Sequence, residues 1–501
     1  MMPKNKIVVL SDIHISTNDP TNWYQKTFHE PLLSTILEYV IREADSIQEL
    51  ILLGDIFDFC TYPPNHRPPE FAAIIKANPN IFGVDGKLSK VLTALKGEVT
   101  YVNGNHDMNV TKNDLHQIQN LYDYQIKYSP ELTYYIQTSG RKKIAFTHGH
   151  IFTMFNAPYY DSAISPLPLG YFITRAVAYQ LNKTLKPGET VADLSDQGAP
   201  NGIHLGNLVS SVAETLSSGS LVNLVLNYIT KVTGIPANEP IILPEGQITT
   251  IQKAKELYQN LQNKWINDWG LLATEKSAIA DLNGNYMAWF AQRSALISGS
   301  DLIVLGHTHL PKLGIKNGLV GYANNGFECP SSPDIPLRTF TFTVVDTDKY
   351  SASIHQVVKE NNSYKIIPYY STEDLVISFP SIDYSCYVIV DNTNGKSQLN
   401  LTNYDAAHGY YVVSPPQIIM PGETRKFWLQ DYPGTVGTEG STIYSIQDTS
   451  TNLHLRYSCP TLSTNYASGN DHFYTSNDGV NWGNKNEIKK LGHPFFVKFV
   501  L

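Results

Sequence analysis

The feature that most constrains this chain is a series of short, continuous apolar runs, each of which stops abruptly at a cluster of polar residues. The runs cover residues 7–10, 50–53, 99–102, 144–146 and 302–305. Runs of this length are typical of strands buried on both faces of a parallel sheet. Apolar residues at helical spacing fill the stretches between the first three runs. The alternation therefore predicts an α/β fold with a parallel or mixed sheet and crossover helices.

The polar clusters that end these runs contain carboxylates, imidazoles and one amide. In chain order they are Asp12 and His14, then Asp55 and Asp58, then Asn105, His106 and Asp107 after Gly104, then His148, and finally His307 and His309. The carboxyl ends of parallel strands meet at one edge of a sheet, so we expect these side chains to lie together. Taken singly, each cluster could equally be a cap or a polar corner. Five in order, each at a strand end, indicate a metal site.

The residue types narrow the choice of metal. Nitrogen and oxygen ligands without a thiolate suit manganese, iron, zinc, cobalt or nickel and disfavour a magnesium or calcium cage. Seven candidate ligands are too many for one ion and about right for two if one carboxylate bridges them: Asp12, His14, Asp55, Asn105, His148, His307 and His309. Two metal ions ~3.5–4 Å apart are suited to phosphate ester hydrolysis. His106 has the chemistry of a general acid, and Asp107 could fix its orientation.

The ordered motifs Asp-x-His, Gly-Asp-x-x-Asp, Gly-Asn-His-Asp, His and Gly-His-x-His resemble those of the calcineurin-like metallophosphoesterases, over residues 6–358. The resemblance implies a four-layer α/β/β/α sandwich and two ions, with manganese, iron or zinc expected. It assigns Asp12, His14, Asp55 and His309 to the first ion, and Asp55, Asn105, His148 and His307 to the second. It also implies that His106 contacts the phosphate and that Asp58 supports the site. The implied reaction is hydrolysis of a phosphate monoester, diester or diphosphate by a hydroxide that bridges the metals.

Residues 157–297 interrupt the strand pattern and are called the insertion below. Helical patterns over 169–184, 205–232, 249–269 and 286–297 predict a helical cap within a catalytic domain of residues 1–372. The cap's aromatic residues form either its own core or a ligand groove: Tyr171, Phe172, Trp265, Trp269, Trp289 and Phe290. The insertion loosely resembles that of UDP-2,3-diacylglucosamine diphosphatases, which implies a lipid-linked or nucleotide-like substrate. Arg67 and Arg175 are candidate phosphate contacts, with surface salt bridges as the alternative.

Residues 375–501 differ in composition and are rich in Tyr, Asn, Thr, Ser and Gly. Short strand-like runs between turn residues predict a separate all-β sandwich. Scattered residues resemble aegerolysins, which bind membrane lipids, so peripheral membrane or glycan contact is one expectation for this domain. The rival hypothesis for the whole chain is a non-catalytic scaffold, or a lipid- or carbohydrate-binding protein that acts through this domain.

Composition excludes some functions. A formal net charge of −8 argues against a general nucleic-acid binder. The expected partner, a phosphorylated small molecule or lipid, is what the resemblance to calcineurin-like metallophosphoesterases implies. The four cysteines, Cys60, Cys329, Cys386 and Cys459, form no Cys-x-x-Cys pair and are expected to be reduced. No stretch resembles a signal peptide or reaches the ~18 apolar residues of a membrane span, so we expect a soluble cytoplasmic protein.

Overall fold

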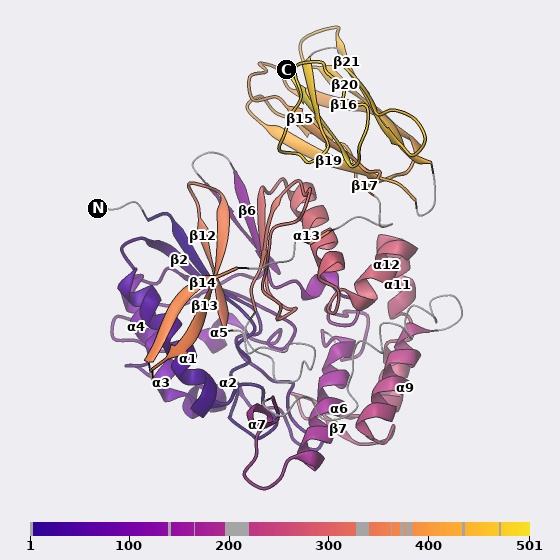
Figure 1. Ribbon diagram of the computed structural model, residues 1–501. Helices are drawn as coiled ribbons and strands as arrows, with labels where there is room; N and C mark the ends of the chain where they lie inside the picture. Colours follow the sequence, from indigo (N-terminus) through magenta and orange to yellow (C-terminus); the bar gives the residue numbers. More distant parts are fainter. Residues whose placement is uncertain are drawn as a thin grey trace. The chain divides into compact units, whose positions relative to one another are not determined.

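The computed structural model describes residues 4–138, 142–164, 166–195, 220–326, 340–361, 363–370, 375–376, 383–432, 436–469 and 472–501 (Figure 1). By internal contacts the chain forms two compact units. The first unit contains Met1–Met287, Val304–Leu313 and Tyr322–Glu373, and the second contains Ala288–Ile303, Gly314–Gly321 and Asp374–Leu501.

The first unit is built on a seven-stranded mixed sheet with the strand order β14-β13-β12-β1-β2-β3-β4. Its strands are β1 (Lys6–Leu10), β2 (Ile47–Leu53), β3 (Val99–Val102), β4 (Lys127–Tyr128), β12 (Thr341–Asp346), β13 (Ser351–Glu360) and β14 (Ser363–Tyr369). Strands β1 to β4 run parallel, and β12 to β14 add antiparallel pairs at the β1 side. The predicted α/β architecture is therefore confirmed. The first three apolar runs form its parallel centre.

A second, five-stranded sheet has the order β10-β11-β9-β6-β5. Its strands are β5 (Thr133–Gln137), β6 (Lys143–Thr147), β9 (Leu302–Leu305), β10 (Lys312–Leu313) and β11 (Gly321–Asn324). The two remaining apolar runs, in β6 and β9, are neighbours in this sheet. All five polar clusters thus follow central strands of the two sheets.

Helices accompany the seven-stranded sheet: α1 (Lys26–Arg42), α2 (Phe71–Ala77), α3 (Pro79–Phe82), α4 (Lys87–Ala94) and α5 (Lys112–Leu115). The apolar faces of α1 and α4 form one buried core with β1, β2 and β3. Pro31 lies inside α1, which begins at Lys26. The ring removes one backbone hydrogen bond there, and burial of Leu32, Leu33 and Ile36 compensates for the loss.

The insertion forms helices with a core of their own. The short helix η1 (His150–Phe152) precedes α6 (Leu169–Thr184), α7 (Val191–Ser195), α9 (Leu221–Thr233), α10 (Ile251–Leu257), α11 (Leu261–Trp269), α12 (Leu271–Ile279) and α13 (Gly284–Ser298), with the small hairpin β7 (Ile241–Ile242) and β8 (Ile248–Thr249). Tyr171, Phe172 and Trp265 are buried in this core, and Trp269 packs against it. Of the two roles considered for these aromatic residues, the cap's own core or a ligand groove, these four therefore have the first.

The helices of the insertion differ from the predicted ranges in three places. The helix predicted over 249–269 is two helices, because the chain turns at Tyr258, whose hydroxyl donates to the Leu167 carbonyl. The helix α9 begins after Ser220, whose side chain caps the Asn223 amide; the rest of the predicted 205–232 helix lies outside the described residues. The helix α12 was not predicted. In the described residues, no helix combines the length and apolar character needed to cross a bilayer.

The second unit contains two five-stranded sheets, with the orders β17-β19-β15-β24-β23 and β18-β16-β20-β21-β22. Its strands are β15 (Cys386–Asp391), β16 (Leu399–His408), β17 (Tyr410–Val413), β18 (Ile418–Ile419), β19 (Thr424–Gln430), β20 (Gly437–Ile446), β21 (Asn452–Pro460), β22 (Tyr466–Ser468), β23 (His472–Ser476) and β24 (Phe495–Val500). The ring of Phe427 in one sheet lies 5.9 Å from Tyr457 in the other. The C-terminal region is thus largely β, as predicted.

Two aromatic residues assigned to the cap belong to the second unit instead. The indole of Trp289 donates to Gln430 Oε1 at 3.0 Å and its ring lies 5.7 Å from Trp428, while Phe290 packs against Trp289. Helical spacing of apolar residues indicates that a residue is buried, but it does not indicate which part of the molecule that residue packs against.

Of the cysteines in the described residues, Cys60, Cys386 and Cys459 are buried and free.

Candidate metal centre

Five of the predicted ligands adopt a backbone conformation that side chains normally avoid. Asp12, His14, Asp55, His307 and His309 have φ angles of 62°, 57°, 53°, 74° and 57°. Left-handed backbone costs a non-glycine residue free energy, and such residues concentrate at functional sites. Here the conformation lets the chain turn directly at the strand end. The turns are fixed by hydrogen bonds: the His14 amide donates to the Asp55 carbonyl at 2.8 Å and the His307 amide to Asp12 Oδ1 at 2.8 Å.

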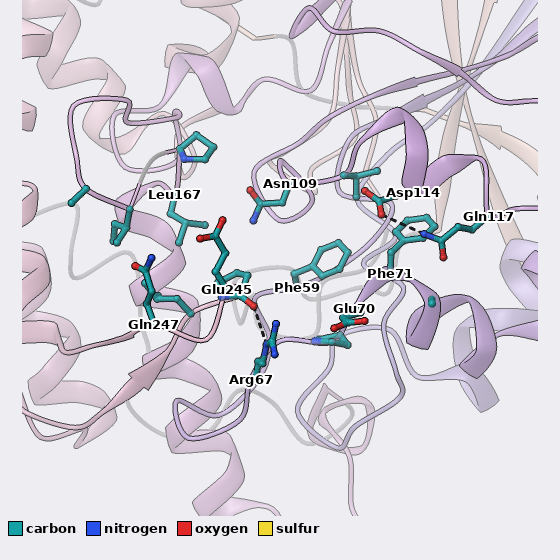
Figure 2. Close-up of a pocket in the computed structure, with 18 residues that line it drawn as sticks. Phe59, Arg67, Glu70, Phe71, Asn109, Asp114, Gln117, Leu167, Glu245 and Gln247 are labelled. Atoms are coloured by element: carbon teal, nitrogen blue, oxygen red, sulfur yellow. Dashed lines mark hydrogen bonds between the residues drawn. The ribbon is translucent and has the colours of Figure 1, made fainter.

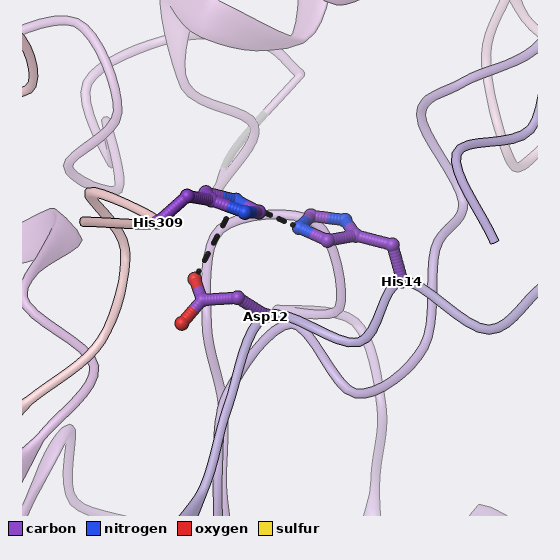
Figure 3. A group of neighbouring side chains, drawn as sticks. All are labelled: Asp12, His14 and His309. Atoms are coloured by element: carbon purple, nitrogen blue, oxygen red, sulfur yellow. Dashed lines mark hydrogen bonds and ion pairs between the residues drawn. The ribbon is translucent and has the colours of Figure 1, made fainter. Parts of the chain in front are cut away.

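Asp12, His14 and His309 form the first cluster, drawn in Figure 3. His309 Nε2 lies 3.7 Å from Asp12 Oδ1 and 3.2 Å from His14 Nε2. Asp55 Oδ2 lies 3.8 Å from His14 Nε2, so this carboxylate borders the cluster as well. These are the four residues that the sequence resemblance assigns to the first metal ion.

Asp55, His148 and His307 form the second cluster. Asp55 Oδ2 lies 3.1 Å from His148 Nε2, so one carboxylate oxygen faces both clusters. Asn105 is buried, and its Oδ1 has no hydrogen-bond partner in the described part of the chain. An unpaired buried amide oxygen is the state expected of a ligand atom.

Lone-pair directions test whether these residues fit metal ions. His148 Nδ1 donates to the Leu53 carbonyl at 2.9 Å, and His14 Nδ1 donates to Asp58 Oδ2 at 3.1 Å. In its neutral form each ring therefore turns the lone pair of Nε2 into the site, that of His148 toward the Asp55 carboxylate and that of His14 toward His309 Nε2. Acceptors at such distances repel unless a cation lies between them. The donor set and its orientation therefore fit two metal ions.

The titration properties point the same way. Asp12, Asp55 and Asp58 are at most 1% exposed, and the ion pairs that the structure shows for them are all with histidines. Burial raises the pKa of Asp12, while for His148 the carboxylates of Asp55 and Asp12 outweigh burial and raise the pKa to about 9. The site thus requires positive charge, which a proton or a metal ion can supply.

His106 is paired with Asp58, not with Asp107. His106 Nδ1 lies 3.3 Å from Asp58 Oδ2, and Asp58 Oδ1 accepts from the amides of Cys60 and Thr61. Burial disfavours the charged ring, but the Asp58 carboxylate outweighs burial and holds the pKa of His106 well above its ordinary value.

Asp107 shapes the backbone around the site. Its carboxylate accepts from the amides of Ile56 and Gly104 at 2.8 and 2.6 Å and from the Tyr101 hydroxyl. The expectation that Asp107 orients the His106 ring is therefore corrected. Sequence adjacency favoured Asp107, but its carboxylate is engaged by backbone amides and the Tyr101 hydroxyl, and the carboxylate that contacts the His106 ring is that of Asp58.

Two glycines are required by close approach. A Cβ on Gly104 would lie 2.2 Å from Asp55 Oδ1, and a Cβ on Gly54 would lie 2.7 Å from both the Gly104 nitrogen and the His148 ring. Gly54 also has a φ of 78°. The loops after β2, β3 and β6 can therefore converge only because these two positions lack side chains.

Sequence reasoning missed two residues at this site. The Trp23 ring lies 4.6 Å from His14, 5.0 Å from His106 and 5.9 Å from His309, so it forms an aromatic wall beside the first cluster and His106. Asp281 of the insertion contacts His307. Neither residue belongs to a motif or a strand end, so no sequence signal distinguished them.

The two candidate phosphate contacts lie elsewhere. Arg175 is fully buried, and its guanidinium donates to the Tyr171 hydroxyl and to the carbonyls of Pro63, Pro64 and His66. It is therefore neither a phosphate contact nor a surface salt bridge. Arg67 donates to the Pro244 carbonyl at 3.0 Å and lines a cleft of about 610 Å³ (Figure 2).

The cleft in Figure 2 lies between the loop after His106 and the insertion. Asn109 and Val110 line it from the loop, and Leu167, Leu243 and Glu245 from the insertion. Its lining combines apolar with acidic and basic side chains.

Comparison with known proteins identifies part of the chain. Residues 5–184 match the family model of calcineurin-like phosphoesterases. A search of curated proteins gave no significant match. Among solved structures, a dimetal phosphatase from Danio rerio is similar at 11% identity and a TM-score of 0.27, covering 74% of this chain and 100% of that chain. The match over residues 5–184, together with the buried His and Asp clusters, shows that the chain is an enzyme with a calcineurin-like metallophosphoesterase domain.

Proposed function

We propose that this protein is a dinuclear metal-dependent hydrolase of a phosphate monoester, diester or diphosphate. The observation that supports it most is the pair of His and Asp clusters that share the buried Asp55 carboxylate. Asp12, His14, Asp55 and His309 would hold one ion, and Asp55, Asn105, His148 and His307 the other. Manganese, iron or zinc ions at such ligands supply a water nucleophile at neutral pH and compensate the charge that develops on the phosphate.

The chain's own residues supply proton transfer and position. His106, kept protonated by Asp58, is suited to donate its proton to the leaving oxygen of the ester. Asp107 acts on catalysis indirectly, because it holds the backbone of Gly104 and Ile56 around the site. Trp23 excludes water from the histidine rings that it covers.

The test is hydrolysis of p-nitrophenyl phosphate and bis-p-nitrophenyl phosphate by the full chain, with Mn²⁺ and after chelation. We expect activity that chelation abolishes and Mn²⁺ restores, and its loss in Asp55→Asn, because that carboxylate faces both clusters. Asp45→Asn, which changes a carboxylate outside the clusters, is the control. An Asp55→Asn enzyme as active as the wild type, or a wild type without metal-dependent activity, would contradict the proposal.

We propose that the cleft beside the His106 loop accepts the non-phosphate part of the substrate. Its lining includes Asn109, three residues after His106, and the apolar side chains among its lining residues suit a lipid chain or a nucleobase. A lipid diphosphate and a nucleoside diphosphate derivative therefore belong in the substrate panel. A Leu167→Trp variant, which fills the cleft, should raise KM for the preferred substrate without affecting p-nitrophenyl phosphate. An equal effect on both would contradict this assignment.

A second proposal concerns the C-terminal region, which we infer contacts an anionic membrane surface. Val436, Leu462, Val480 and Leu491 are 53%, 97%, 77% and 78% exposed. They lie on loops that hydrogen bonds hold together: the Thr461 amide donates to the Val436 carbonyl, and the Asn465 amide to the Lys490 carbonyl. Exposed apolar loop tips beside Lys489 and Lys490 match a lipid surface, which accepts apolar side chains and attracts basic ones.

Vesicle flotation with the full chain tests this second proposal. We expect flotation with vesicles of phosphatidylcholine and phosphatidylserine, and at least a several-fold loss in a Leu462→Ser, Leu491→Ser double variant. Leu121→Ser, at another exposed leucine, is the control. Absence of flotation in the wild type would exclude the membrane and leave the phosphoesterase proposal intact.

A further inference from the structure

A carboxylate of the insertion contacts a histidine of the second cluster. Asp281 follows α12, and its Oδ1 lies 2.6 Å from His307 Nε2. Its other oxygen, Oδ2, accepts from Asn156 Nδ2 at 2.9 Å. The carboxylate is therefore held at both oxygens, with the His307 ring on one side and the Asn156 amide on the other.

This contact decides which nitrogen of His307 can serve as a ligand. A carboxylate accepts hydrogen bonds, so Nε2 must carry the proton and Nδ1 the lone pair. His307 belongs to the cluster with Asp55 and His148, in which ligand atoms lie within 4.8 Å of one another. A carboxylate on the outer nitrogen of such a histidine fixes its tautomer and raises its basicity as a ligand.

The insertion also contacts the segment that follows His148, and that segment in turn reaches His307. The Met154 amide, shortly after His148, donates to the Ser277 carbonyl of α12 at 3.1 Å. Thr153 Oγ1 lies 3.4 Å from His307 Nε2. The segment after His148 is therefore joined to α12, the helix that precedes Asp281, and the same segment contacts His307.

We infer that Asp281 is a positioning residue for His307, through which the insertion sets the affinity of the second cluster for its metal ion. The inference rests on the metal centre of the proposed function. It gives the insertion a role in metal retention, in addition to lining the cleft. Because the contact between Asp281 and His307 couples the insertion to the second cluster, metal binding at that cluster should in turn stabilise α12.

The experiment measures metal binding instead of catalysis. Chelated full-length wild type, Asp281→Asn and Asp281→Ala are titrated with Mn²⁺ in equilibrium dialysis, with bound metal determined by elemental analysis. We expect two ions per chain in the wild type and a ~10–100-fold weaker second ion in Asp281→Ala. Asp281→Asn should be intermediate, because its amide oxygen still accepts a hydrogen bond. The control is Asp161→Asn, an exposed carboxylate of the insertion that pairs with Lys264 at 3.4 Å.

Hydrogen exchange supplies a second readout. Mn²⁺ should slow amide exchange across α12 in the wild type and in Asp161→Asn but not in Asp281→Ala. Wild-type affinity for both ions in a folded Asp281→Ala would overturn the inference and leave the proposed function standing. Two bound ions without any phosphoesterase activity would contradict the proposed function and leave the affinity comparison valid. A wild type that binds no metal would overturn both.

Discussion

At the scale of single residues, the pairing of His106 with Asp58 keeps the His106 ring protonated. Asp58 places one oxygen near the Nδ1 atoms of both His14 and His106, so a single carboxylate orients a metal ligand and the candidate general acid. Its own pKa is held well below the ordinary value: burial opposes this, but the neighbouring His106 and His14 dominate. The His106 Nε2 atom is then the one available to a leaving group.

The first prediction concerns the pH dependence of hydrolysis. His106 must be protonated to act as an acid, so activity should persist through neutral pH and fall as pH rises through its elevated pKa. Asp58→Asn removes the charge that raises this pKa, so the alkaline limb of kcat/KM should move to lower pH. The measurement is a pH–rate profile at equal metal content. An unshifted limb would show that another group controls it.

The second prediction separates proton donation from metal binding. His106→Ala should lower kcat ~10²–10⁴-fold for phenyl phosphate, whose leaving group needs a proton. The loss should be much smaller for p-nitrophenyl phosphate, whose leaving group does not. Metal content should stay at the wild-type level. Equal losses for the two esters would contradict the assignment of His106 as general acid.

At the scale of elements, Arg175 attaches α6 to the loop after β2. Its Nη2 donates to the carbonyls of Pro63, Pro64 and His66 at 2.8, 3.0 and 2.6 Å. This loop contains four prolines, which have no N–H, so it offers few amides to satisfy its own carbonyls. A buried guanidinium, with several donors in one plane, can serve three carbonyls at once.

The third prediction follows from this attachment. Arg175→Met should lower the free energy of unfolding by ~2–4 kcal/mol, because it leaves buried carbonyls without donors. Arg67→Met, which removes one exposed hydrogen bond, should cost less than ~1 kcal/mol. Urea unfolding measures both, and metal content should not change in either. Equal stability of the two variants would contradict the structural role of Arg175.

At the scale of the whole molecule, the clusters found in the described residues all lie in the first unit. Metal ions that bind only the folded state stabilise it by mass action, by ~2.7 kcal/mol at a concentration a hundredfold above Kd.

The fourth prediction is therefore that Mn²⁺ raises the melting temperature of the first unit in calorimetry and leaves the melting temperature of the second unit unchanged. Asp55→Asn should abolish the increase. A shift of both transitions would contradict it.

The sequence by itself determined the α/β architecture and predicted the His and Asp residues that lie together at the candidate metal centre. Apolar runs must be buried as strands, and polar residues directly after parallel strands have only one edge of the sheet at which to lie. For Asp12 and Asp55, which follow the parallel neighbours β1 and β2, position in the chain was therefore enough to place the side chains together. His148 follows β6 of the other sheet, so its place beside Asp55 was decided by the tertiary structure.

Only the tertiary structure decided which side chains face one another. Asp107 is adjacent to His106 in sequence, yet Asp58 contacts its ring, because the Asp107 carboxylate accepts from the backbone amides of Ile56 and Gly104 instead. Asp281 reaches His307, and Arg175 reaches the Pro63 carbonyl, across long stretches of chain. Such contacts depend on how helices and loops pack around the sheets, and periodicity along the sequence carries no record of them.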